Sequence, residues 1–174
     1  MLIQKMIRAA KLDIHLYEEV EADTKATSEA MLVVILSSLS AGIGLGIRGG
    51  LRGLLLGIVA SLIGWFIWAL ITYVIGTTLF KGPQTKTNIA ELLRTLGFSA
   101  SPGVIRILGF IPAMTHLVFL IAGIWSLVAM VVAVRQALDF TTARAIGTCI
   151  VGWIIQIIIL GFILGPVGRC PLLR

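Results

Sequence analysis

The sequence predicts an all-α integral membrane protein: a bundle of about five transmembrane helices with an amphipathic helix at its N-terminus. Of its 174 residues, 58% are hydrophobic and only 13% are charged, and the mean hydropathy is +1.05. A soluble domain has about a quarter of its residues charged, so lipid is the expected solvent. Because each helical crossing takes about 20 apolar residues, five crossings leave no room for a separate soluble catalytic domain.

Residues 1–29 are expected to form a cytoplasmic unit, with an amphipathic helix over residues 1–19 followed by an acidic linker. Apolar residues from Ile3 to Tyr17 recur at three- and four-residue spacing, whereas Lys5, Arg8 and Lys11 lie off that stripe. The helix could pack on the cytoplasmic end of the bundle, or lie in the headgroup plane with its cations facing anionic lipid. The acids at positions 18, 19, 21 and 23 favour a protein contact or a solvated face over a purely electrostatic lipid anchor.

Residues 30–168 are expected to hold the five spans, leaving residues 169–174 as a short C-terminal tail. The spans cover about 30–47, 54–80, 89–110, 113–134 and 145–167. The third contains the cations Arg94 and Arg106, and it is interrupted at Pro102 and Gly103. Because proline removes a backbone donor, this pattern predicts a broken helix. Cations inside a membrane usually face a bundle interior or snorkel to the interface.

The distribution of basic residues predicts the orientation. With the N-terminus in the cytoplasm, nine of the 14 Lys and Arg residues fall on the inner side and five on the outer side. Loops rich in Lys and Arg stay in the cytoplasm, so the C-terminus is expected outside. The predicted location is a prokaryotic plasma membrane.

Glycines recur at four-residue spacing, which is typical of closely packed membrane helices. Gly44, Gly46 and Gly49 match a dinucleotide-binding pattern by accident, because they follow a membrane span where that motif needs a strand. The helix-packing glycines are expected to act within the chain or at a homo-oligomer seam; they are Gly49, Gly53, Gly57, Gly161 and Gly165.

A charge cluster is expected where the fourth span connects to the fifth. Asp139 can pair with Arg135 four residues earlier or with Arg144, and partial burial would make this a structural salt bridge. The segment from Asp139 to Gly147 resembles the start of a phosphatidyl-transferase motif. However, Gln156 and Leu160 stand where its further metal carboxylates would be needed.

We find no set of residues for catalysis, a cofactor or a metal, so the chain is not expected to be an enzyme. His15 and His116 are far apart and lack neighbouring ligands, and no nucleophile elbow or phosphate-binding loop occurs. The net charge of +6 suits lipid headgroups, and no basic and aromatic residues interleave as nucleic-acid binding would require.

Long stretches of the chain resemble the Ypt-interacting-protein (Yip) family of five-span membrane proteins, in its prokaryotic branch. They are AAKLDIHLYEEVEADTKAT, ELLRTLGFSASPGVIRILGFIP and IWSLVAMVVAVRQALDFTTARAIGTCIVGW. The resemblance implies no catalytic residues. Eukaryotic members are associated with prenylated Rab-type GTPases and vesicle traffic, and they partner one another in the bilayer. Prokaryotic cells lack that GTPase cycle.

The expected function is that of a non-enzymatic membrane-organising or accessory protein that binds other membrane proteins, or itself, in contact with membrane lipids. One alternative is a small transporter or lipid-handling protein built around the broken third helix. Another is a resident subunit of a respiratory or photosynthetic complex.

Overall fold

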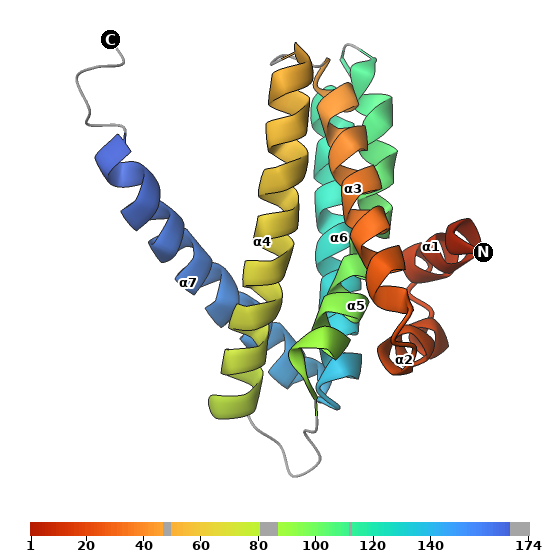
Figure 1. Ribbon diagram of the computed structural model, residues 1–174, viewed down its shortest axis with the longest axis vertical. Helices are drawn as coiled ribbons and strands as arrows, with labels where there is room; N and C mark the ends of the chain where they lie inside the picture. The colour runs from red at the N-terminus through yellow and green to blue at the C-terminus, as the bar shows by residue number, and fades with distance from the viewer. Residues whose placement is uncertain (47–49, 81–86, 112, 168–174) are drawn as a thin grey trace.

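The computed structural model describes residues 1–46, 50–80, 87–111 and 113–167, with side chains up to residue 158, and every regular element in them is helical (Figure 1). The elements are α1 (Leu2–Ala10), α2 (Ile14–Ala22), α3 (Ala26–Gly44), α4 (Gly50–Thr78), α5 (Ile89–Ser99), the 3₁₀ helix η1 (Ser101–Phe110), α6 (Thr115–Ala137) and α7 (Thr142–Val167). This confirms the predicted all-α membrane bundle.

Single helices make three of the predicted crossings. α3, α4 and α6 are each long and apolar enough to span a membrane. They lie side by side in the bundle, whereas α7 diverges from it (Figure 1). α7 has 26 residues, and its part up to Ile158 is an apolar helix. The chain thus runs up and down the bundle as five crossings require.

Two short helices in series make the third passage. α5 has 11 residues and η1 has 10, which correspond to about 16 Å and about 20 Å of rise. Together they exceed the hydrocarbon thickness of about 30 Å. Pro102 lies in the first turn of η1, where a missing backbone donor is tolerated. Hydroxyls of Ser99 and Ser101 donate to carbonyls of the preceding turn at this junction, each at 2.7 Å.

Glycines let this broken passage approach the backbone of α3. A Cβ added at Gly44 would collide with the carbonyl oxygen of Arg106, and one added at Gly97 would lie 2.6 Å from the Cβ of Ala30. A Cβ at Gly103 would collide with the hydroxyl of Ser37 on α3. A 3₁₀ segment has poorer hydrogen-bond geometry than an α-helix, so protein on its flanks protects it from lipid.

The N-terminal region differs from the single helix expected over residues 1–19, because it divides into α1 and α2. Leu12 adopts a left-handed conformation with φ of 62°, which costs a non-glycine residue roughly 1–2 kcal/mol. Asp13 offsets this cost by capping α2, since its Oδ1 accepts from the His15 N–H at 3.1 Å. Arg8 also donates to Asp13 across the turn at 2.7 Å. Asp13 is the feature of the sequence that indicates this break, because aspartate is favoured at the first position before a helix.

We predict that Gly44→Ala lowers the melting temperature of the protein in mild detergent. The added methyl group meets a backbone carbonyl that cannot rotate away, and such overpacking typically costs about 1–3 kcal/mol. Gly123→Ala in α6 is the matched control, because no atom lies within 4 Å of its new Cβ. It should leave the melting temperature unchanged or raise it. Equal melting temperatures for the two variants would contradict the close approach of α3 and η1.

Candidate functional site

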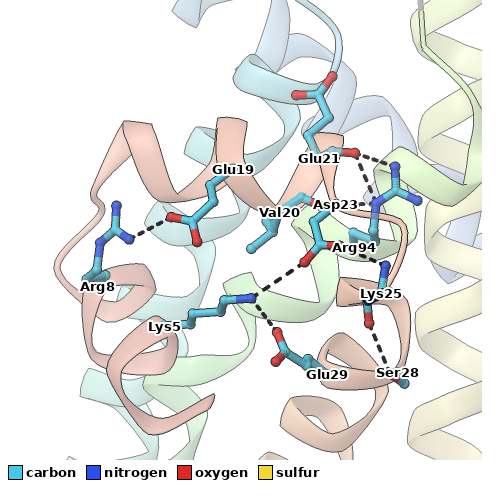
Figure 2. A network of polar contacts seen from close by, with 10 residues as sticks. All are labelled: Lys5, Arg8, Glu19, Val20, Glu21, Asp23, Lys25, Ser28, Glu29 and Arg94. Atoms are coloured by element: carbon cyan, nitrogen blue, oxygen red, sulfur yellow. Dashed lines mark hydrogen bonds and ion pairs between the residues drawn. The ribbon is translucent and has the colours of Figure 1, made fainter. Parts of the chain in front are cut away.

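Arg94, on α5, joins the N-terminal helices to the bundle (Figure 2). Its side chain is buried, with the whole residue 5% exposed. Its Nε donates to the carbonyls of Val20 and Glu21, both at 3.0 Å, and its Nη2 also donates to Glu21. These carbonyls lie in the last turn of α2, where helices lack internal partners and carry the negative end of the dipole. A cation from α5 therefore caps α2.

The cations of α1, Lys5 and Arg8, pair with acids of residues 13–29. Lys5 Nζ lies 2.7 Å from Glu29 Oε2 on α3 and 3.8 Å from Asp23 Oδ2 (Figure 2). Arg8 Nη1 lies 2.8 Å from Glu19 on α2. Of the two placements that the sequence left open for this region, these ion pairs favour packing on the protein. Exposed pairs of this kind contribute about 0–1 kcal/mol each, so their main effect is to fix geometry.

Side chains of α6 make hydrogen bonds to both α1 and α2. The Trp125 indole N–H donates to the carbonyl of Ala10, at the end of α1, at 2.7 Å. Gln136 Nε2 donates to Glu18 of α2 at 2.8 Å. Tyr17 is fully buried between α1 and the bundle and donates to Ala9 at 3.3 Å. We call α1, the turn and α2 the N-terminal hairpin, residues 2–22.

The hairpin presents an apolar outer face. Ala9 of α1 is buried against the bundle, whereas Met1, Ile3, Ile7 and Ile14 are exposed, Ile3 to 71% and Ile7 to 50%. The predicted apolar stripe is therefore divided between an inner and an outer side. One side packs on the bundle, and the other remains open for a further contact.

Glu21 is the acid of the hairpin whose pKa is raised. Partial burial, helped by the nearby carboxylates of Glu91 and Asp139 and opposed by Arg94, raises its pKa to about 7. The carboxylates of α2, α5 and the turn after α6 thus converge at one end of the bundle.

The residues of the predicted charge cluster, Arg135, Asp139 and Arg144, are all exposed. None of the ion pairs among the described residues joins them. α6 ends at Ala137, and Asp139 is left-handed with φ of 50°. The Asp139 N–H donates to Gln136 and the Phe140 N–H to Arg135, which is a Schellman ending. Asp139 therefore ends α6, and the four-residue helical spacing from Arg135 does not exist.

The other predicted residues are placed as follows. Arg94 and Arg106 lie on the two halves of the broken passage, and Arg106 is partly buried with its guanidinium carbon 6.0 Å from the ring centroid of Phe119. Gly53 and Gly57 meet no atom within 4 Å of an added Cβ. Gly49 lies outside the described residues. Gly161 and Gly165 lie on α7, beyond the described side chains.

Sequence reasoning missed the glycines that do pack closely. Gly44 and Gly97 are not spaced at four residues from one another, and each meets a different residue on a neighbouring element. Spacing along one helix cannot reveal a contact that depends on a second one. Among the described residues, no group of three or more His, Cys, Asp or Glu side chains could hold a metal ion.

This arrangement is that of an integral helical membrane protein, with the N-terminal hairpin packed against α5 and α6 of an apolar bundle. The model of the Yip1 domain family matches residues 17–163, and the chain belongs to that family. The match runs from within α2 to within α7. No curated protein and no solved structure matches the chain.

We predict that Arg94→Leu releases the hairpin while leaving the bundle folded. The change leaves the carbonyls of Val20 and Glu21 without their donor, at a cost of about 1–3 kcal/mol for each buried group left unpaired. Hydrogen exchange should show faster exchange in residues 2–22 than in α4 or α6. The control is Arg135→Gln, a change of an exposed residue in the last turn of α6, and it should alter neither the exchange of the hairpin nor that of α4 and α6. Unchanged protection of the hairpin in Arg94→Leu would contradict the capping role.

We predict that Glu21→Gln stabilises the protein at pH 8 but not at pH 5. An acid whose pKa is raised on folding binds protons more readily in the folded state, so the stability of the wild type falls as pH rises from about 4.5 to about 7. The amide removes this penalty, which is on the order of 1 kcal/mol after screening by solvent. Thermal unfolding in detergent at both pH values measures it. An equal gain at both would show that titration of Glu21 is not its cause.

Proposed function

We propose that this protein is a non-enzymatic accessory protein that organises other membrane proteins, and that it binds a partner through the outer face of the N-terminal hairpin. We place it in a prokaryotic plasma membrane with the N-terminus in the cytoplasm and the C-terminus outside. Membership of the Yip1 domain family and the membrane bundle support the general role.

The exposed apolar face of the hairpin carries the proposal. Ile3 and Ile7 lie on α1. Trp125 of α6 donates to the end of this helix and Glu29 of α3 pairs with its Lys5, so the exposed side chains are held in place before any partner arrives. A preorganised surface loses less conformational entropy on binding. The acids of α2 beside this face add polar contacts of the kind found at an interface rim.

The alternatives make different demands on the structure. A transporter built on discontinuous helices typically uses a pair of corresponding interrupted segments in two repeats. In the part of the chain that the structure describes, the interruption at Pro102 has no counterpart in α3, α4 or α6. A resident subunit of a larger complex would use the same hairpin face, so identifying the partner separates that role from a more general organising one.

A photo-reactive amino acid at position 7 tests the proposal in native membranes. We expect discrete protein adducts from this position and only lipid adducts from position 117, an exposed residue near the start of α6. The double variant Ile3→Gln and Ile7→Gln should reduce recovery of the crosslinked partner at least about fivefold without lowering the melting temperature, because each exposed apolar side chain contributes on the order of 1 kcal/mol to an interface. Lipid adducts alone at position 7 would contradict the proposal and place the hairpin in the headgroup plane.

A further inference from the structure

A cleft of about 610 Å³ lies within the bundle, between α3, α4 and α5, with Arg106 of η1 and Met130 of α6 also on its wall. Its α4 side includes four small residues, Gly53, Gly57, Ser61 and Gly64, beside the larger Leu54, Trp65 and Trp68. A Cβ at any of these three glycines would meet no atom within 4 Å. Because Gly53 and Gly57 are exposed, the cleft opens to the surroundings of the bundle. Within the chain, Gly53 and Gly57 therefore border open space and do not pack against another helix.

The cleft runs along the membrane-spanning direction. From Gly53 to Trp68 on α4 it covers 15 residues, or about 22 Å of helix rise. Leu45 and Arg106 lie at one end of the cleft. The backbone carbonyl of Arg106 lies close to Gly44, the last residue of α3. The far end, at Trp68, is apolar. The length exceeds half of a hydrocarbon core of about 30 Å, so the cleft reaches from the helix ends past the middle of the bundle.

Arg106 is the one charged side chain among the described residues that line the cleft. No ion pair or hydrogen bond within the described part of the chain engages its guanidinium. The chain has eight acidic residues, at positions 13, 18, 19, 21, 23, 29, 91 and 139. Those on the bundle lie in the first turns of α3 and α5 and after α6, which is the opposite end from Gly44 (Figure 1).

None of the Asp and Glu side chains, all of which the structure describes, therefore lies where it could neutralise Arg106. The ring of Phe119 lies 6.0 Å from the guanidinium carbon but carries no negative charge. A cation without a counter-ion at membrane depth is costly, and an external anion would lower that cost. Guanidinium binds phosphate with two parallel hydrogen bonds, which makes a phosphate group the matching anion. In a bilayer, the phosphate of a lipid lies next to the apolar acyl chains of the same molecule.

We propose that the cleft binds one anionic phospholipid of the bilayer, with its phosphate on Arg106 and one acyl chain along the glycine face of α4. Charge and length favour this occupant, because the cleft has one guanidinium at one end and then runs along α4 past glycines that leave open space. A phospholipid has the matching order, with a phosphate at one end and apolar chains beyond it. The site is independent of the hairpin face and does not depend on the function proposed above.

Lipid binding to the purified full chain tests the site. Native mass spectrometry with added phosphatidylglycerol should show one retained lipid per chain. Arg106→Gln should weaken binding about tenfold, as expected for loss of a charge-assisted hydrogen bond, while Arg106→Lys should keep most of it. Diacylglycerol with the same chains, which has no phosphate, should bind no better to the wild type than to Arg106→Gln.

Gly57→Leu tests the acyl-chain part at a position with room for the new side chain, so folding should be unaffected. With phosphatidylglycerol carrying a photo-reactive acyl chain, adducts in the wild type should concentrate on α3 and α4, and Gly57→Leu should reduce them several-fold. Gly123→Leu, off the cleft, and Arg52→Gln, an exposed cation at the same end, are the controls and should behave as the wild type. Adducts spread evenly around the bundle, equal binding in Arg106→Gln, or adducts between two protein chains at position 57 would each overturn the proposal.

Discussion

Backbone contact between α3 and the broken third passage positions both arginines of that passage. Gly44, Gly97 and Gly103 lack the side chains that would hold α3 away from α5 and η1. A bilayer offers no water to satisfy backbone groups, so irregular backbone is tolerated only where protein surrounds it. The 3₁₀ segment meets this condition because α3 and α6 flank it, and its two halves place Arg94 at one end of the bundle and Arg106 towards the other.

The two arginines meet opposite electrostatic surroundings. Arg94 finds the carbonyls at the end of α2, among the acidic residues of the chain, and so becomes an internal cap. Arg106 lies far from every acid and beside an open cleft. The same residue type on one passage therefore connects two parts of the protein at one end and is available to an external anion at the other. This difference separates the proposed partner surface from the proposed lipid site.

Several features could be predicted from local pattern. The spans follow from apolar length, and Asn88 and Glu91 form the capping box at the start of α5 that their spacing indicates, with the Glu91 N–H 3.0 Å from Asn88 Oδ1. Local pattern could not decide whether Asp139 pairs with Arg135, because that pairing required α6 to continue through Leu138. Burial of Leu138 and Phe140 favours the Schellman ending, and Asp139 tolerates the left-handed conformation it needs.

The sequence by itself determined that the chain is a helical membrane bundle, where its third passage breaks, and that its N-terminal segment is amphipathic. These depend on residues near one another in the chain, through hydrophobic length, proline geometry and helical periodicity. Only the tertiary structure decided which face of α1 is covered, that Arg94 caps α2, and that Gly53 and Gly57 border a cleft while Gly44 and Gly97 pack closely. Each of these depends on a neighbour distant in sequence, whose position is fixed by how whole helices pack and not by any local pattern.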